Sequence, residues 1–164
     1  MAEFLRHSGA LEQLLYSYSQ TRSVHLFTDQ SLDYLRWRYS EYPYVNYAVL
    51  YQEKAGALSG CIILRPNTRF GLKEVVIDEL SLPKPDEGLA SSLLDELKRC
   101  LSADYIIAYF PRHSFERHIL HRHGFHQVPV GGMNFTVNVL TWHVPCNPMV
   151  LGNWGLSLGD LEVF

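Results

Sequence analysis

Two neighbouring features of the sequence could carry chemistry. An acidic pair, Asp78 and Glu79, lies near the end of an apolar run over residues 75–82, which stops at Pro83. A carboxyl group can act as a general base when it reaches the proton it removes and has a suitably tuned pKa. A short loop then leads through Gly88-Leu-Ala90 into a helix-type pattern. Because the free amides and the dipole at a helix N-terminus favour anions, this second feature could bind a phosphate group.

The composition narrows the class of protein. A chain of 164 residues with 47% hydrophobic and 19% charged residues fits one globular domain, so we expect residues 1–164 to fold as a single unit. A net charge of −3 gives no electrostatic reason to expect a nucleic-acid partner, which usually needs a basic face. Cys61, Cys100 and Cys146 form no C-x-x-C pair, so neither a zinc ribbon nor a disulfide framework is indicated.

The sequence also predicts where the protein works. No run approaches the roughly 20 apolar residues that span a membrane. The first residues, Met1-Ala-Glu-Phe-Leu-Arg6, include an acid and lack the long apolar core of a signal peptide. Unpaired cysteines are typical of a reducing compartment. We therefore expect a cytoplasmic protein that has no membrane partner.

Hydrophobic periodicity divides the chain into helices and strands. Helices are predicted over 1–22, with the periodic part at 3–19, then from a cap at Thr28, Asp29 or Ser31 to a point before Pro43, and over 87–101 and 113–122. Strands are predicted over 23–27, 47–51, 60–64, 72–82, 104–110, 125–130 and 134–140. The tail over 145–164 has little periodicity and is expected to pack on the domain.

This order of elements predicts the fold class. Each element must bury its apolar face against another layer, so we expect an α/β domain with a mixed, mainly antiparallel central sheet flanked by helices. Periodicity alone would allow other α/β topologies. The order strand, G-x-A turn, helix, strand and helix, closing on Gly124-Phe125, resembles the GNAT superfamily of acyl-CoA-dependent N-acyltransferases. The resemblance narrows these topologies and implies a GNAT-like (acyl-CoA N-acyltransferase) fold with acetyl-CoA or another acyl-CoA as co-substrate.

The resemblance also implies which residues bind the co-substrate. The backbone of Leu80, Ser81 and Leu82 would pair with the pantetheine arm, and Gly88, Leu89, Ala90 and Ser91 would hold the pyrophosphate. The family carries Arg or Gln where this chain has Pro85, which offers neither charge nor N–H. Asp86 and Glu87 add negative charge at the same place, so an ordinary helix N-terminus is the alternative interpretation.

Catalysis is implied in the same way. Glu79 matches the carboxylate that removes the amine proton, directly or through water. Side chains alternate along a strand, so one member of the Asp78–Glu79 pair would otherwise simply point outward. Leu120 occupies the place of the tyrosine that protonates the departing thiolate in many members of the superfamily. The acid would then come from Tyr109, His121 or His123, or be absent.

Two further groups of residues have ordinary explanations. Five histidines lie between residues 113 and 126, and His118 and His121 share a helix face, a spacing that a metal can use. The acidic partner that such a site needs is missing, so no metal site is predicted. In the GNAT superfamily, the region of Arg36 and Arg38 forms a wall of the acceptor site. The two arginines lie on different sides of their helix, so at most one faces that site, where a guanidinium could clamp a carboxylate or phosphate. Packing of the helix by Trp37 and Tyr39, with the arginines in solvent, is the alternative.

Two functions therefore stay open. The first is an N-acyltransferase that moves an acetyl or other acyl group from acyl-CoA to a small-molecule or peptide amine. The second is a non-catalytic GNAT-like binding or interaction module that has lost turnover; Pro85 and Leu120 favour it. A homodimer is also left open. Trp37 and the tail 153–160 resemble, more weakly, the C-terminal halves of longer two-part GNAT-like proteins, which would explain an incomplete site.

Overall fold

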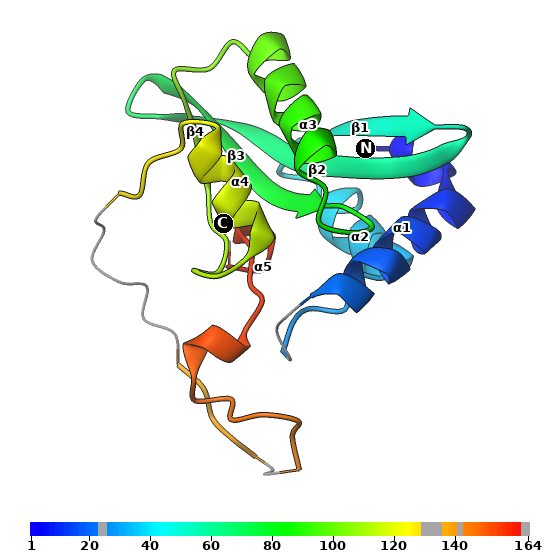
Figure 1. The fold of residues 1–164 in the computed structure, drawn as a ribbon. Helices are drawn as coiled ribbons and strands as arrows, with labels where there is room; N and C mark the ends of the chain where they lie inside the picture. Colours follow the sequence, from blue (N-terminus) through cyan, green and yellow to red (C-terminus); the bar gives the residue numbers. More distant parts are fainter. Residues whose placement is uncertain (23–25, 129–135, 141–142, 162–164) are drawn as a thin grey trace.

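The chain folds into a sheet between two layers of helices (Figure 1). The structure, a computed structural model, describes residues 1–22, 26–128, 136–140 and 143–161. The N-terminal layer comprises the 3-10 turn η1 (Phe4–Arg6) and the helices α1 (Ser8–Thr21) and α2 (Leu32–Tyr39). The remaining elements are β1 (Ala48–Lys54), β2 (Ala57–Arg69), β3 (Leu72–Ser81), α3 (Glu87–Cys100), β4 (Tyr105–Ala108), α4 (Phe115–Arg122), the 3-10 turn η2 (Leu151–Asn153) and α5 (Leu158–Leu161). None of the described helices is long and apolar enough to cross a membrane.

The sheet confirms the predicted fold class. Its described strands lie in the order β1-β2-β3-β4, with β1, β2 and β3 joined as antiparallel hairpins and β4 parallel to β3. The first hairpin turns at Ala55 and Gly56, with φ of 53° and 78°, and the second at Phe70 and Gly71, with φ of 53° and 81°. Positive φ at both central residues matches the twist of the flanking strands, which explains the glycine in each turn.

Two irregularities shape the end of β3. The β2–β3 register shifts between Ile63 and Leu64, because Ile63 faces Glu79 whereas Leu64 faces Ile77. This leaves Asp78 as an extra residue on β3, which is a β-bulge. The pairing of β3 with β4 ends where Ile77 faces Ala108, although β3 itself continues to Ser81. The two parallel strands therefore part just after the bulge.

Each face of the sheet carries its own core. Alternate residues of β2 and β3, such as Ile62 and Leu80, pack with the buried face of α3 and α4. Cys61 and Ile63 point the other way, against η1, α1 and α2. The side chains of Ser31, Asp86 and Ser114 accept backbone hydrogen bonds at the starts of α2, α3 and α4, so Ser31 is the one of its three predicted alternatives that caps α2.

Four predicted elements need correction. The described residues 125–128 and 136–140 form no strand, although strands were predicted over 125–130 and 134–140; the other positions of those two predictions lie outside the described residues. Their alternating apolar pattern is a local signal, and a strand also needs a neighbour to pair with. The N-terminal helix predicted for 1–22 begins only at Ser8, after the 3-10 turn. Of the predicted strand 23–27, residues 23–25 lie outside the described part, and Leu26 makes a single bridge to Trp154.

Candidate functional site

The bulge at Asp78 changes where the acidic pair points. Strict alternation would send one of the two carboxylates outward, but Asp78 and Glu79 are 0% and 1% exposed. Glu79 contacts Tyr39 of α2, and Asp78 lies beside Arg65 of β2, so neither points into solvent. An extra residue in a strand breaks the two-residue period, which is why the prediction from alternation was wrong.

The Glu79 carboxyl lies in a closed polar environment. Its Oε1 accepts a hydrogen bond from the Tyr39 hydroxyl at 2.9 Å and another from the Ser157 hydroxyl at 3.0 Å. Burial raises the pKa of Glu79 to about 7, and the nearby Asp160 carboxylate adds to that rise. The neighbouring Gln30 amide, the positive charge of Arg22 and the hydrogen bond from Tyr39 act in the opposite direction. A carboxyl group with a pKa near neutrality can take up and release a proton at physiological pH.

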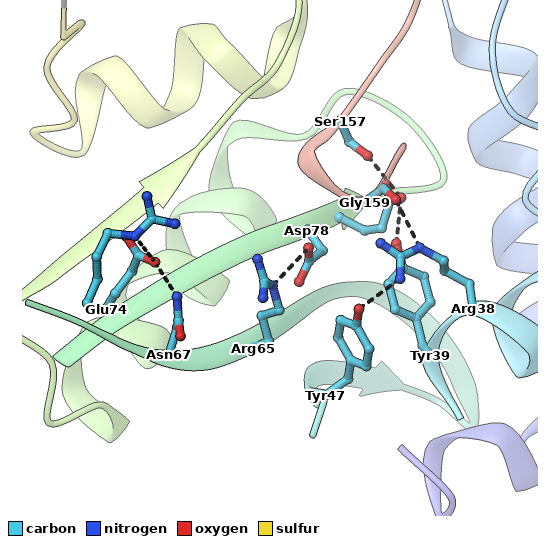
Figure 2. A network of polar contacts seen from close by, with 11 residues as sticks. Arg38, Tyr39, Tyr47, Arg65, Asn67, Glu74, Asp78, Ser157 and Gly159 are labelled. Atoms are coloured by element: carbon cyan, nitrogen blue, oxygen red, sulfur yellow. Dashed lines mark hydrogen bonds and ion pairs between the residues drawn. The ribbon is translucent and has the colours of Figure 1, made fainter. Parts of the chain in front are cut away.

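Asp78 is buried with less compensation. Neither of its side-chain oxygens has a hydrogen-bond partner among the described residues, and Arg65 Nε lies 3.9 Å from Oδ1 (Figure 2). Burial raises the pKa of Asp78 to about 7, while the positive charges of Arg65 and Arg38 oppose the rise. Two neighbouring carboxyl groups on one strand therefore both favour the neutral form more than a carboxyl in water does.

The C-terminal segment 155–161 closes this part of the sheet. Arg38 Nε donates to the carbonyl of Gly159 at 3.1 Å, and Arg38 Nη1 donates to the Tyr47 hydroxyl at 2.8 Å (Figure 2). Asp160 Oδ2 accepts the backbone N–H of Ser157 at 2.8 Å, which fixes the turn into α5. Arg38 is thus the one of the two predicted arginines that points inward, and its guanidinium binds the protein's own backbone.

Gly159 fits against Glu79 without room for a side chain. A Cβ at this position would lie 2.7 Å from Glu79 Oε1 and 3.3 Å from the Asp78 carbonyl oxygen, and it would also collide with the Tyr39 hydroxyl. We expect Gly159→Ala to lower the free energy of unfolding by about 1–3 kcal/mol, the usual cost of overpacking. Urea titration measures it. Gly9→Ala on α1 is the control because no atom lies within 4 Å of the added Cβ there; equal stability of the two variants would contradict the close packing of the C-terminal segment on β3.

A cleft of about 1060 Å³ opens where β3 and β4 part. Leu82 lines one side, just after β3, and Phe110 lines the other, just after β4. Ser157 also lines the cleft, so the Glu79 carboxyl lies directly behind a residue of the cleft wall. Among the described lining residues, the charged side chains are mostly cationic: Arg22, Lys84, Arg112 and Arg117, with Glu116 as the carboxylate. A cleft of this size and charge suits a small anionic ligand.

Comparisons with known proteins concern the fold. No family model and no curated protein matches the sequence. Among solved structures, the ribosomal-protein-alanine N-acetyltransferase of Brucella melitensis biovar Abortus 2308 aligns with 81% of this chain and 95% of its own, with a TM-score of 0.59 and 19% identity. A protein of Thermus thermophilus aligns with 77% of this chain and 93% of its own, with a TM-score of 0.43 and 13% identity. The chain has a GNAT-like fold. At 19% identity the likeness concerns the fold alone and carries no substrate with it.

The residues that the GNAT-like fold implies for acyl-CoA lie in two places. Leu82 lines the cleft, whereas the side chains of Leu80 and Ser81 are buried. At the start of α3, the Asp86 carboxylate accepts the Leu89 N–H at 3.0 Å, and the Asp86 carbonyl accepts the Ala90 N–H at 3.0 Å. A pyrophosphate at this helix end would have to displace an anionic cap. The Ser91 hydroxyl lies 2.9 Å from His123 Nε2, and no atom presses closely on Gly88.

The residues considered as the general acid do not lie together. Leu120 is buried in the core between the sheet and α3, so it is a packing residue. His123 contacts both Ser91 and Asp95, whereas His121 lines the cleft together with His118. The structure therefore leaves His121 as the one of the three predicted acids that lies at the cleft. Among the described residues, no group of three or more His, Cys, Asp or Glu side chains is arranged to hold a metal ion.

Sequence reasoning missed the partners of Glu79. Tyr39 was predicted only as a packing residue of its helix, and Ser157 belonged to a tail with little periodicity. One local signal was present, because Ser157-Leu-Gly-Asp160 has the spacing of a capping box at the start of a short helix. The contact of this segment with β3 spans 78 positions of sequence, and no local pattern predicts such a contact.

Proposed function

We propose that this protein transfers an acyl group, such as acetyl, from acyl-CoA to an amine in the cleft between β3 and β4. The observation that carries the proposal is the position of Glu79: a carboxyl with a pKa raised to about 7 is hydrogen-bonded to a residue of the cleft wall at the place where the two parallel strands part. The GNAT-like fold adds the reaction class by analogy.

The charge of the cleft supports an acyl-CoA as the donor. Lys84 lies on the loop after β3, and Arg112 lies on the loop after β4, so cations flank the mouth of the cleft from both sides. Arg117 follows on the first turn of α4, where its Nη2 donates to Gln127 Oε1 at 2.8 Å. Phosphate groups bind well among such cations, with charge-assisted hydrogen bonds about twice as strong as neutral ones. Lys84 lies two residues before Asp86, whose carboxylate already caps the start of α3.

The chemistry needs one base and one oriented thioester. The amine nitrogen attacks the thioester carbonyl, the C–N bond forms as the C–S bond breaks, and the sulfur leaves with the bonding electron pair. Glu79 takes the proton that the amine must lose. Positioning of the two reactants in the cleft supplies the entropic part of the rate enhancement. A cleft of about 1060 Å³ has room for an amine acceptor, either a small molecule or a peptide.

Calorimetry with acetyl-CoA tests the proposal, with desulfo-CoA as the non-reactive check. We expect the double substitution of Lys84→Ala with Arg112→Ala to weaken binding by roughly 10–100-fold, or about 1.4–2.7 kcal/mol in total, because both side chains are exposed and each exposed charge contact contributes about 1 kcal/mol. Arg99→Ala is the matched control, since Arg99 is exposed near the end of α3 and pairs with Glu96. The binding site is wrongly assigned if the control and the double variant lose equal affinity.

The other end of the predicted site is tested separately. A bulky residue in place of Gly88 would keep a pyrophosphate away from the backbone at the start of α3. A large loss of affinity in Gly88→Val would place the pyrophosphate on α3, as the family resemblance implies. Absence of binding at millimolar acetyl-CoA in the unmodified protein would exclude both positions and the proposed function.

A second candidate is a GNAT-like module that binds a ligand without turnover. Two observations favour it: Asp86 occupies the helix end where the superfamily holds pyrophosphate, and Leu120 is a core residue where many members have an acid. A screen of amine acceptors separates the two functions. Clear binding of acetyl-CoA without acylation of any acceptor would favour the module, and acylation of one acceptor would exclude it.

A further inference from the structure

Three side-chain oxygen atoms, Glu79 Oε1, Ser157 Oγ and Asp160 Oδ2, lie within hydrogen-bond distance one after the other. The middle atom belongs to a residue that lines the cleft. The Ser157 hydroxyl lies 3.0 Å from Glu79 Oε1 and 3.1 Å from Asp160 Oδ2. Ser157 is only 4% exposed, yet it lines the cleft, whereas Glu79 behind it is 1% exposed. A hydroxyl that caps a helix accepts a bond from the helix, but this one donates toward two carboxylates. Ser157 is therefore placed between the cleft and the buried carboxyl.

The Ser157 hydroxyl contacts two carboxyl oxygens but has a single hydrogen to donate. A serine hydroxyl has one hydrogen, so it can donate to Glu79 or to Asp160 but not to both at once. The second contact becomes a hydrogen bond only when a carboxyl group carries a proton and donates it to the serine oxygen. Glu79 Oε1 also accepts from Tyr39, and Asp160 Oδ2 accepts from the Ser157 N–H, so the row of three oxygen atoms is held in place at both ends.

We infer that Ser157 is a proton relay, through which the buried carboxyl of Glu79 exchanges protons with the cleft while Asp160 holds the serine in position. The inference rests on the proposed acyl transfer for its substrate. As the amine attacks, its proton passes to Ser157 Oγ, and the hydroxyl hydrogen of Ser157 passes to Glu79 Oε1. Ser157 is neutral before and after the step, Glu79 ends as a carboxylic acid, and the sulfur leaves as a thiolate. Direct contact between the amine and Glu79 is then unnecessary.

The surroundings of Glu79 favour this role. Burial raises its pKa to about 7, so the neutral acid formed by the relay is an accessible state. The titratable and charged groups that face it come from α1 and the turn after it, from α2, from the sheet and from α5: Tyr18, Arg22, Tyr34, Tyr39, Cys61 and Asp160. Burial also raises the pKa of Tyr18, Tyr34, Tyr39 and Cys61, so these groups stay protonated near neutral pH. Asp78, the preceding residue of β3, also has a pKa raised to about 7, but its side-chain oxygens have no hydrogen-bond partner among the described residues and so take no part in the contacts of Ser157.

The first experiment needs no turnover. NMR titration of the Glu79 side-chain carboxyl carbon between pH 4 and 9 reports its midpoint in the unmodified protein, Ser157→Ala, Ser157→Thr and Asp160→Asn. We expect Asp160→Asn to lower the midpoint, because the carboxylate that raises the pKa of Glu79 is removed. We expect Ser157→Ala to raise it, since the ionised form loses a donor, and Ser157→Thr to restore it. An unchanged midpoint in both Ser157→Ala and Asp160→Asn would overturn the relay, whatever the turnover.

The second experiment uses the acylated acceptor. Loss of the relay should lower kcat by roughly 10²-fold or more, within the usual range for proton transfer. The KM for acyl-CoA should stay unchanged, and Ser157→Thr should recover most of the rate because it keeps the hydroxyl. Full activity in Ser157→Ala would overturn the relay. If the midpoints move as expected but no acceptor is acylated, the proposed function and the relay both fail, while the hydrogen bond between Ser157 and Glu79 is supported.

Discussion

Glu79→Gln is expected to lower turnover by roughly 10²–10⁴-fold, the usual loss when an acid–base group is removed. Glutamine keeps the size of the side chain and can still accept from Tyr39 and Ser157 through its carbonyl oxygen, so the packing of the C-terminal segment should survive. The affinity for acyl-CoA should stay nearly unchanged, because the cationic residues proposed to bind it lie at the mouth of the cleft and not around Glu79. Steady-state kinetics with the best acceptor measures the loss.

The matched control uses the same substitution on the same strand. Glu74 is also a buried glutamate of β3, but it bonds with Asn67 and Arg69 at the far end of the strand. Glu74→Gln should therefore leave kcat near that of the unmodified protein. In the unmodified protein, kcat/KM should rise with pH and level off above about 7, because the base must be ionised. Activity that survives Glu79→Gln, or a flat pH profile, would remove Glu79 from the mechanism.

The local signals of the sequence were sufficient for the order of the elements, and the family resemblance narrowed the topology. Glycine at each hairpin turn, capping residues such as Ser31 and Asp86, and apolar residues on one face of α3 each act within a few positions of sequence. They correctly predicted the order of the elements from α2 to α4 and the mixed, mainly antiparallel sheet. The strands predicted over 125–130 and 134–140 were wrong in their described residues, because a strand must pair with a neighbour that can be distant in sequence.

The site depends on contacts that no local pattern contains. Glu79 was named as a base because of a family resemblance, and that role stays a prediction. Its burial arises from a one-residue bulge at Asp78 and from a C-terminal segment that packs against β3. A bulge leaves no clear mark in the amino-acid pattern, and a hydrogen bond between Ser157 and Glu79 depends on the whole fold. Asp86 was predicted only as an acidic residue that suits an ordinary helix N-terminus, and its hydrogen bond with the Leu89 N–H is local in sequence.

Asp78→Asn is expected to stabilise the protein at alkaline pH and to change little in acid. Burial raises the pKa of Asp78 from 3.8 to about 7, so between these values the folded protein holds a proton that the unfolded chain has released. The free energy of unfolding therefore falls as the pH rises from about 4 to about 7 and is level with respect to this group above pH 7. Asparagine has no charge to bury. At about 1.36 kcal/mol per pKa unit, the variant should gain as much as about 4 kcal/mol at pH 8 and almost nothing at pH 4.

Urea titrations at pH 4, 6 and 8 measure this difference, with Glu74→Gln as the control. Glu74 is better compensated than Asp78, since Asn67 Nδ2 donates to it at 2.8 Å and Arg69 Nε lies at 3.6 Å. Removing the charge of Glu74 weakens both of those contacts, so that substitution should destabilise at pH 8. We expect the two substitutions to change the free energy of unfolding at pH 8 in opposite directions. That result would show that burial without hydrogen bonds, and not the position on β3, is what makes the Asp78 carboxylate unfavourable. Destabilisation by Asp78→Asn at pH 8 would instead mean that its charge is satisfied, and the bulge would then hold a stabilising ion pair rather than an acid that gains a proton on folding.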